Sequence, residues 1–324
     1  LSIETVKDPE PRAEDIVIKV HRCGICGTDL HLTSAHQFSF LAGSVLGHEY
    51  AGEVVEIGSA VTGIRKGDIV TALPSRGCGH CDTCRRGNVP LCRNETGEMG
   101  GFGEYLRIQG HLAVQLPGTL SLADGALIEP LAVSLYGVRQ ANMQPGDRVL
   151  VLGGGAVALT TIYWAKRLGA GRIVCVSRSR RREAMALAMG ADAFVQSGDN
   201  EIGDVAEALG GPPAIVFECV GATGIVARAI EHVAPFGTVM SLGFCTAPDS
   251  FVPAMAGNKC ATLKFSIGYT LRDFEHAANV MDKGHADPKM LITSTVTLDD
   301  MPAKFESLRA PNDDTKVHVL IAGT

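Results

Sequence analysis

The feature that most constrains the fold is a regular alternation of short apolar stretches with helical ones between residues 147 and 268. Strands are predicted at 148–152, 172–177, 193–196, 214–219, 237–242 and 261–267. Helices are predicted at 156–169, 180–189, 201–209 and 223–234, each with a glycine at or near its end. A strand-helix-strand repeat forms a parallel sheet covered on both faces. The pattern therefore predicts an α/β, doubly wound domain of six strands at 132–269.

The segments on either side of this repeat have a different character. Short β-branched runs at 16–20, 52–57, 68–73 and 105–108 are separated by glycines and loops, which is typical of an irregular, mostly β domain. The tail has a predicted helix at 272–283 and a final strand at 316–322, without the alternation of the middle. We therefore assign 1–131 and 270–324 to one mostly β domain.

The charge balance restricts the partners. Lys and Arg number 29 against 35 Asp and Glu, so the chain lacks the basic field that nucleic acids or anionic membranes require. Its wholly apolar runs, such as 149–152 and 214–217, are far shorter than the roughly 20 residues of a membrane-spanning helix. We expect a cytoplasmic protein whose partners are small molecules and neither nucleic acids nor membranes.

Four of the ten cysteines lie close together in the sequence: Cys78, Cys81, Cys84 and Cys92. Disulfides are rare in intracellular chains, and cysteines separated by two residues return their sulfurs to one point, as in zinc-binding loops. Four thiolates complete the tetrahedral coordination of zinc and leave no position for a substrate. We predict a structural zinc in a lobe at 77–93, with four free thiols as the alternative.

A glycine turn between the first strand and the first helix of the repeat indicates a nucleotide site. In this turn Gly153 permits the change of direction, and Gly155 lets a pyrophosphate approach the backbone. Ala156 and Val157 begin the helix, whose free N–H groups and positive dipole end face the phosphates. The turn predicts a dinucleotide-binding, or Rossmann, domain. A turn that binds no ligand is the alternative.

The end of the second strand favours NADP over NAD. NAD-binding domains place an acidic residue there to bond the ribose 2′-hydroxyl, whereas this chain has Ser177. An arginine-rich run from Arg178 to Arg182 follows, and guanidinium groups bind the extra phosphate of NADP. A solvated basic helix start, with NAD bound less specifically, is the alternative.

Three further stretches contain potential metal ligands: Cys23-Gly-Ile-Cys26-Gly-Thr28-Asp-Leu-His31, Gly47-His48-Glu49 and Ile128-Glu129-Pro130-Leu131. Together with the motifs at 51–58, 218–221 and 242–244, they make the chain similar to a known family over essentially its whole length. It resembles the zinc-dependent alcohol and polyol dehydrogenases of the medium-chain dehydrogenase/reductase superfamily. The resemblance implies a GroES-like catalytic domain, made of both chain ends, into which the Rossmann domain is inserted.

The resemblance assigns a catalytic zinc to Cys26 and His48, with Glu129 as third ligand or as a carboxylate that acts through zinc-bound water. Glu49 belongs to the ligand set or lies just outside it. His48 and Glu49 can both reach one ion only if the backbone bends after Gly47, because neighbours in a strand point to opposite faces. Thr28 and His31 would relay the proton of the alcohol, with a solvated surface histidine as the alternative for His31.

The resemblance also places cofactor contacts in the second half of the chain: Cys219, Val220, Leu242, Gly243 and Lys316. Lys316 is equally compatible with an ordinary surface lysine. The cysteines without metal-binding neighbours are predicted to be core residues: Cys23, Cys175, Cys219, Cys245 and Cys260.

We therefore predict an oxidoreductase that uses zinc and NADP(H) to transfer hydride between a secondary alcohol or polyol and its ketone. Two zinc ions per chain are expected. His36, Phe38 and Phe40 hint at a bulky or partly apolar substrate. A homodimer or homotetramer is expected, because the partly apolar strand at 261–267 would leave an unpaired sheet edge. The alternatives are a zinc-free enone or quinone reductase of the same fold and a non-catalytic NADPH-binding protein.

Overall fold

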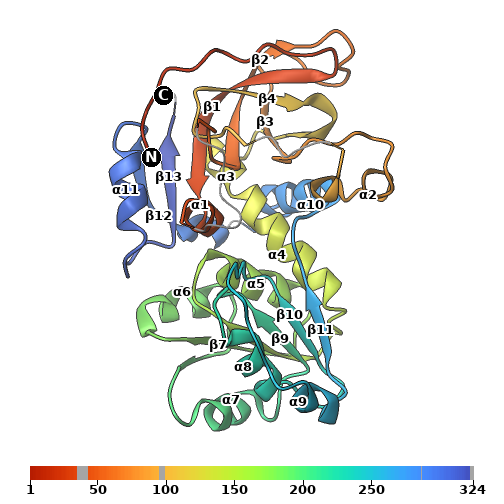
Figure 1. The fold of residues 1–324 in the computed structure, drawn as a ribbon, viewed down its shortest axis with the longest axis vertical. Helices are drawn as coiled ribbons and strands as arrows, with labels where there is room; N and C mark the ends of the chain where they lie inside the picture. Colours follow the sequence, from red (N-terminus) through yellow and green to blue (C-terminus); the bar gives the residue numbers. More distant parts are fainter. Residues whose placement is uncertain (35–42, 95–98, 286, 322–324) are drawn as a thin grey trace. The chain divides into compact units, whose positions relative to one another are not determined.

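The computed structural model describes residues 1–34, 43–94, 99–285 and 287–321. The chain divides into two compact units: unit 1 consists of Leu1–Ala132 and Gly268–Thr324, and unit 2 of Val133–Ile267. Each unit contains its own sheet and its own hydrophobic core (Figure 1). The residues that we linked to substrate size lie outside the described residues: His36, Phe38 and Phe40.

Unit 2 is built on a six-stranded sheet with the order β11-β10-β9-β6-β7-β8. Its strands are β6 (Arg148–Leu152), β7 (Arg172–Ser177), β8 (Ala193–Gln196), β9 (Ile215–Glu218), β10 (Thr238–Ser241) and β11 (Thr262–Phe265). Every neighbouring pair is parallel, which confirms the predicted doubly wound sheet. The strand order reverses between β6 and β9, and ligands of such sheets bind at the carboxyl ends of the strands at this point.

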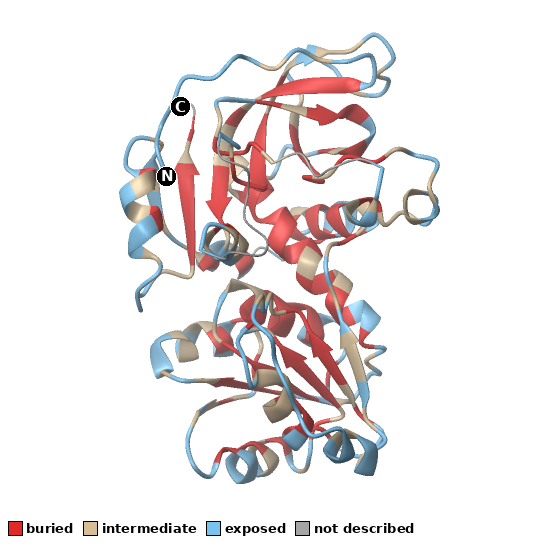
Figure 2. Cartoon of the chain, viewed as in Figure 1, coloured by how far each residue is buried: buried red, intermediate tan, exposed pale blue. Residues whose placement is uncertain are grey.

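Helices cover both faces of this sheet. They are α5 (Ala156–Arg167), α6 (Glu183–Ala188), α7 (Glu201–Leu209), α8 (Ile225–His232) and α9 (Pro253–Asn258). α7 and α8 pack on the face that presents Leu150, Val174 and Val216, and Figure 1 shows α5 and α6 on the other face. The four inner strands β6, β7, β9 and β10 are accordingly mostly buried, whereas the edge strand β11 has no buried residue (Figure 2). The predicted helix at 180–189 begins instead as a 3₁₀ turn over Arg180–Arg182.

Unit 1 is mostly β, as predicted. Its strands are β1 (Asp15–Ile25), β2 (Glu49–Ile57), β3 (Ile69–Ala72), β4 (Tyr105–Gln109), β5 (Ala113–Gln115), β12 (Ile292–Thr297) and β13 (Lys316–Leu320). The sheet order is β12-β13-β1-β2-β3-β5, with β4 also paired to β1. β1 pairs with β2 on one side and with β13, from the end of the chain, on the other. This pairing brings tail residues next to the N-terminal motifs.

Short helices and turns complete unit 1. They are α1 (Gly27–Leu32), α2 (Asp82–Arg85), α3 (Leu122–Ala126), α10 (Leu271–Asp282), α11 (Met301–Ser307), and the 3₁₀ turns η1 (Val89–Leu91), η2 (Gly110–Leu112) and η4 (Asp287–Leu291). The division between the units falls within α4 (Ile128–Gln140). The sequence analysis did not anticipate β5, β12, α1, α3, α4, α9 or α11.

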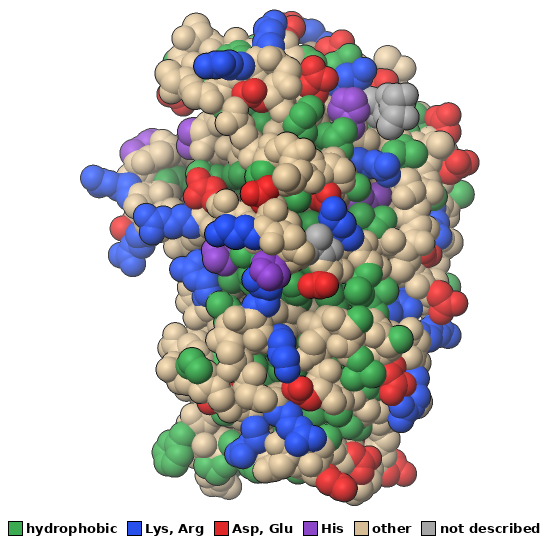
Figure 3. Space-filling model, turned by 180° about the vertical axis from the view of Figure 1, so that it is seen from behind, with side chains coloured by type: hydrophobic (Ala, Val, Ile, Leu, Met, Phe, Trp, Pro, Cys, Tyr) green, Lys and Arg blue, Asp and Glu red, His purple; other side chains and the backbone are tan. Residues whose placement is uncertain are grey.

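The helices and the surface bear on the expected partners. Within the described part of the chain, no helix combines the length and the apolar character that crossing a bilayer would take. On the face drawn in Figure 3, Lys and Arg side chains are interspersed with Asp and Glu. This mixture is in keeping with the balanced composition of 29 basic and 35 acidic residues.

Candidate active site and metal centres

The four clustered cysteines converge on one point in unit 1. Their sulfur atoms all lie within 4.8 Å of one another, and those of Cys81 and Cys92 are 3.9 Å apart. Four sulfurs in a tetrahedron at the Zn–S distance of about 2.3 Å would be separated by about 3.8 Å. The helical turn of α2 brings Cys84 back toward Cys81. The cluster fits the structural zinc predicted from the spacing.

Hydrogen bonds favour the thiolate form at one of these cysteines. Burial raises the pKa of Cys78, but the backbone N–H groups of His80 and Cys81 and the amide of Asn94 lower it to about 6. Asn94 Nδ2 donates to Cys78 Sγ at 3.3 Å. By contrast, burial raises the pKa of Cys84 to about 12. Because zinc binds thiolates, metal binding at this cluster would release protons.

A second set of donor atoms lies where β1 ends and β2 begins. Cys26 follows β1 as the N-cap of α1, and its Sγ accepts from the backbone N–H of Thr28 at 3.5 Å. Gly47 has φ +90°, a left-handed conformation that favours glycine, and it bends the chain just before His48. β2 begins at Glu49, so His48 is not held to the alternation of the strand. The donor atoms of Cys26, His48 and Glu49 all lie within 4.8 Å of one another.

Asp29 holds His48, and the sequence analysis missed this residue. Asp29 is fully buried on α1; its Oδ1 lies 3.2 Å from His48 Nδ1, and its Oδ2 accepts from the Cys26 backbone N–H at 3.0 Å. Burial lowers the pKa of His48, but Asp29 and Cys26 raise it well above its usual value. With Nδ1 turned to the carboxylate, Nε2 is the ring nitrogen that can bind a metal. The signal available was the capping-box spacing of Cys26 and Asp29.

Glu49 is paired with a lysine from the far end of the chain. Both side chains are buried, and Lys316 Nζ donates to Glu49 Oε1 at 2.5 Å and to the Ile25 carbonyl oxygen at 3.2 Å. Burial lowers the pKa of Lys316, but Glu49 and Cys26 raise it above its usual value. The alternative of a surface lysine is therefore wrong, because the pairing of β13 with β1 encloses this side chain.

The other carboxylate oxygen of Glu49 tests whether the site suits a metal. Glu49 Oε2 is buried and has no hydrogen-bond partner among the described residues. A buried, unpaired carboxylate oxygen is unfavourable unless a cation or a donor faces it. Here it lies with the sulfur of Cys26 and the imidazole of His48, and zinc prefers such a mixture of ligands. The residues therefore fit a zinc ion.

Glu129 lies close to this set of donors but not within it. It is buried in the first turn of α4 and accepts a hydrogen bond from the hydroxyl of Tyr269, a residue that the sequence analysis did not single out. Burial raises the pKa of Glu129 to about 7, with an opposing effect from His48 and a further increase from Glu49. A carboxyl group with this pKa can take up and release a proton near neutral pH.

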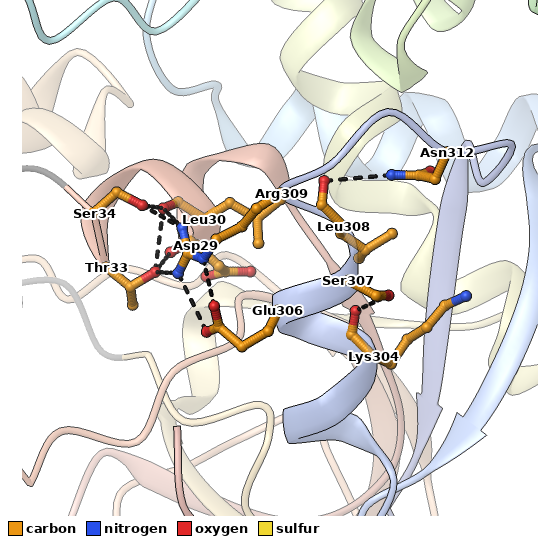
Figure 4. A network of polar contacts seen from close by, with 10 residues as sticks. All are labelled: Asp29, Leu30, Thr33, Ser34, Lys304, Glu306, Ser307, Leu308, Arg309 and Asn312. Carbon is orange, nitrogen blue, oxygen red and sulfur yellow. Dashed lines mark hydrogen bonds and ion pairs between the residues drawn. The ribbon is translucent and has the colours of Figure 1, made fainter.

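The two residues of the predicted proton relay lie on α1. Thr28 is half-buried in its first turn, and His31 is exposed in its last turn. Figure 4 shows Arg309 at the C-terminal end of this helix, where it donates to the Leu30 carbonyl oxygen at 2.9 Å and to Thr33 Oγ1 at 2.8 Å. α1 is thus fixed by the capping box at its start and by Arg309 at its end.

In unit 2 the glycine turn joins β6 to α5 at the carboxyl end of the sheet. Gly153 has φ +122°, and Gly155 is the N-cap of α5, without a capping side chain. No described atom lies within 4 Å of a Cβ built on Gly155, so the backbone is open to a ligand there. Ala156 and Val157 form the first positions of the helix, whose N–H groups are available to an anion. The turn fits a pyrophosphate.

Ser177 and Arg182 adjoin this turn. A Cβ built on Gly154 would lie 3.1 Å from Ser177 Oγ and 3.5 Å from Arg182 Cβ. Arg178 is exposed directly after β7, whereas Arg180 forms an ion pair within its own turn. The sequence analysis proposed both Arg178 and Arg182 for the cofactor. Arg182 lies next to the glycine turn, and Arg178 lies just beyond the end of β7, the strand beside it.

The remaining predicted cofactor residues of unit 2 belong to two neighbouring loops. Cys219 and Val220 follow β9, and Leu242 and Gly243 follow β10. Since β9 lies between β6 and β10, both loops and the glycine turn meet at the carboxyl edge of one sheet. The Cys219 backbone N–H donates to the carbonyl oxygen of Leu152, the last residue of β6, at 2.9 Å.

Two predictions about single cysteines were wrong. Cys245 and Cys260 are exposed and do not belong to a core. Cys260 has φ +47° in the turn between α9 and β11. Cys23 and Cys175 are buried as expected, and Cys219 is half-buried.

Known proteins are similar to this chain in sequence and in fold. The family described as Alcohol dehydrogenase GroES-like domain matches residues 12–118, and Zinc-binding dehydrogenase matches residues 156–283. The chain is 31% identical to "Probable D-xylulose reductase A" of Neosartorya fischeri, over 99% of this chain and 92% of that protein. 2R,3R-butanediol dehydrogenase from Bacillus subtilis superposes with a TM-score of 0.85 at 30% identity, over 98% and 96% of the two chains. A structure from Sinorhizobium meliloti 1021, assigned as a zinc-binding dehydrogenase and bound to NADP, gives 0.87 at 33% identity, over 97% and 94%.

Proposed function

The chain belongs to the zinc-dependent alcohol and polyol dehydrogenases of the medium-chain dehydrogenase/reductase superfamily, and we propose that it prefers NADP(H) and acts on secondary alcohols or polyols and their ketones. The observation that carries the choice of cofactor is the presence of Ser177 and Arg182 beside the glycine turn. The substrate class is supported by relatives named for D-xylulose and for 2R,3R-butanediol. D-xylulose is a ketose and butanediol a secondary diol, so oxidation or reduction of either takes place at a secondary carbon.

We assign the catalytic metal to Cys26, His48 and Glu49. Zinc bound there supplies a Lewis acid toward the oxygen of an alcohol or ketone. Three protein ligands leave one coordination position free, as catalytic zinc sites require. Asp29 orients the imidazole of His48 through Nδ1. Glu129, with a pKa raised by burial to about 7, is the neighbouring carboxylate that exchanges a proton with the site.

We assign proton transfer to Thr28 and His31. The Thr28 hydroxyl can donate and accept, and it lies two residues after Cys26 on α1. His31 is exposed in the last turn of the same helix, where its ring nitrogens can form hydrogen bonds with water. Positions three residues apart lie on the same side of a helix. A proton can therefore leave the site along α1 toward solvent.

The preference for NADP rests on charge at the end of β7. A carboxylate at position 177 would repel the 2′-phosphate of NADP, whereas Ser177 is neutral and can donate a hydrogen bond. Arg178 is exposed and Arg182 adjoins the turn, so both guanidinium groups can approach that phosphate. A charge-assisted contact contributes about 1.5 to 3 kcal/mol, or about 10- to 150-fold in affinity. The relative solved with NADP is in line with this assignment.

The test is the double variant Ser177→Asp with Arg178→Ala. We expect the ratio of kcat/KM with NADP to kcat/KM with NAD to fall by about 10- to 150-fold, while zinc content stays unchanged. Arg172→Ala is the matched control, because Arg172 is an exposed arginine at the opposite end of the same strand. If the wild type already prefers NAD, the arginine run is only a solvated helix start and the assignment of NADP is wrong.

We also propose a homodimer or homotetramer. β11 is an edge strand of the sheet of unit 2. Phe265 at its end and Ile267 just beyond are 74% and 62% exposed. An apolar sheet edge invites pairing with another chain, and a second subunit would cover it.

A further inference from the structure

A buried carboxylate at the end of β9 connects the two loops that we propose bind the cofactor. We propose that Glu218 is a positioning residue that sets the shape of both loops without touching the cofactor itself. The inference rests on the proposed function, because it concerns the dinucleotide site of unit 2.

The side chain of Glu218 accepts hydrogen bonds from two different segments. Oε1 accepts from the backbone N–H of Val220 at 2.7 Å and from that of Gly221 at 2.8 Å. Oε2 accepts from the hydroxyl of Ser241, the last residue of β10, at 2.7 Å. The residue is only 2% exposed, and among the described residues no Lys, Arg or His forms an ion pair with it. Its side-chain hydrogen bonds thus come from two backbone N–H groups and one hydroxyl.

The backbone of Glu218 binds the second loop as well. Its carbonyl oxygen accepts from the N–H of Leu242 at 2.8 Å and from that of Gly243 at 3.0 Å. One residue thus accepts five hydrogen bonds, and these come from both loops after β9 and β10. Because each bond fixes a backbone or side-chain group near the loop start, the relative position of the two loops depends on Glu218.

Two glycines allow the loops to close around this carboxylate. A Cβ built on Gly243 would lie 2.5 Å from Glu218 Oε2, a distance that real Cβ atoms do not reach. Gly221 has φ +70°, and a Cβ there would lie 2.6 Å from the backbone nitrogen of Phe244 in the second loop. The loops therefore approach each other so closely that only glycine fits at both positions.

The same loops adjoin the glycine turn. A Cβ built on Gly153 would lie only 3.2 Å from the carbonyl oxygen of Cys219, so the loop after β9 lies close against the turn. A shift of this loop would alter the surface on which the nucleotide rests. The proposed hydride transfer needs the nicotinamide at a fixed position, because small displacements of reacting groups slow a reaction strongly.

The experiment measures the Kd of NADPH by fluorescence titration of the zinc-loaded protein. Glu218→Met keeps the length of the side chain and removes both acceptors, which leaves three donors unpaired. We expect the Kd to rise by about tenfold or more, since charge-assisted hydrogen bonds are lost. Glu218→Gln keeps an acceptor for the two N–H groups, and its amide can donate to Ser241 Oγ, so we expect a Kd within about threefold of wild type.

Glu201→Met is the matched control for general destabilisation. Glu201 is also a buried carboxylate of unit 2, and it bonds Arg228 and His232, which lie on α8 and not in the cofactor loops. This variant should lower the Tm and leave the Kd of NADPH unchanged. If Glu218→Met does not fold, Glu218→Asp replaces it, because the shorter side chain cannot reach both loops; the same direction of change is expected.

The outcomes separate this inference from the proposed function. A wild type that binds neither NADPH nor NADH would refute the proposed cofactor chemistry itself. A wild type that binds NADPH, together with a Glu218→Met protein that binds it equally well, would overturn the role of Glu218 and leave the function standing. An equal loss of affinity in Glu218→Met and Glu201→Met would also overturn it, since the effect would then follow stability alone.

Discussion

A buried histidine on β13 should make unit 1 sensitive to acid. His318 is fully buried, its position on β13 lies opposite Gly24 of β1, and neither ring nitrogen has a hydrogen-bond partner among the described residues. Burial lowers its pKa to about 3, with a further decrease from Lys316 and Arg22 and an opposing increase from Asp124. The imidazole is therefore neutral in the folded protein over the whole physiological range.

The sign and size of the effect follow from the difference between folded and unfolded states. The pKa of His318 is about 3 in the folded protein, and an unfolded histidine has a pKa of about 6.5. Below pH 6.5 the unfolded chain gains a proton that the folded chain does not, so stability is present above this pH and is lost as pH falls toward 3. pH 5 lies about 1.5 units below the pKa of the unfolded histidine, which corresponds to a loss of about 2 kcal/mol in the free energy of unfolding.

The perturbation is His318→Phe, which keeps a planar ring and removes the titrating group. Urea unfolding at pH 7, 6 and 5, followed by circular dichroism with zinc content measured at each pH, gives the free energy of unfolding. From pH 7 to pH 5 the wild type should lose about 2 kcal/mol more than the variant. The single tryptophan, Trp164, lies in α5 of unit 2, so its fluorescence is an internal control that the variant should not change. Parallel pH profiles for the two proteins would refute the reasoning.

Three further predictions concern the metals, the proton relay and the sheet edge. Metal analysis should find two zinc ions per chain, and fully active enzyme with one zinc would contradict this. A chelator should abolish activity before it unfolds the protein, because the four-cysteine cluster is closed and the Cys26 site is open. Thr28→Val should reduce turnover by about 10² to 10⁴ with zinc content unchanged, provided that hydride transfer limits the rate; unchanged turnover would exclude the relay. Light scattering at micromolar concentration should show a homodimer or homotetramer, and a monomer would contradict the role given to the edge of β11.

The part of the fold that could be predicted is the part with a strong local pattern. The strands of unit 2 are apolar runs separated by glycine-bounded helices, and both signals lie within a few residues of each other. Several of the elements that escaped prediction are short or polar, although α4, with 13 residues, is neither. β5 has three residues, and β12 has the sequence Ile-Thr-Ser-Thr-Val-Thr with alternate half-buried and exposed positions. α1 has six residues and a cysteine as N-cap, which is not among the usual capping residues.

Single cysteines show why burial could not be predicted from residue type alone. Cysteine is on average a buried residue, and on that basis Cys245 and Cys260 are predicted to be core residues. Both are instead exposed, Cys245 in the loop after β10 and Cys260 in the turn between α9 and β11. Residue type gives the average burial, but the loop that contains the residue decides its actual exposure.

Only part of the candidate metal site could be predicted. Cys26 and His48 belong to motifs of contiguous sequence, so a resemblance could identify them, but the sequence named Glu129 as third ligand and left Glu49 open. Lys316 lies 267 positions after Glu49, and only the placement of β13 and β2 on either side of β1 brings the two together. Lys316 holds one carboxylate oxygen of Glu49, and the other oxygen has no partner among the described residues and is available to a cation. The long-range pairing of strands therefore decides which atom of Glu49 can bind the metal.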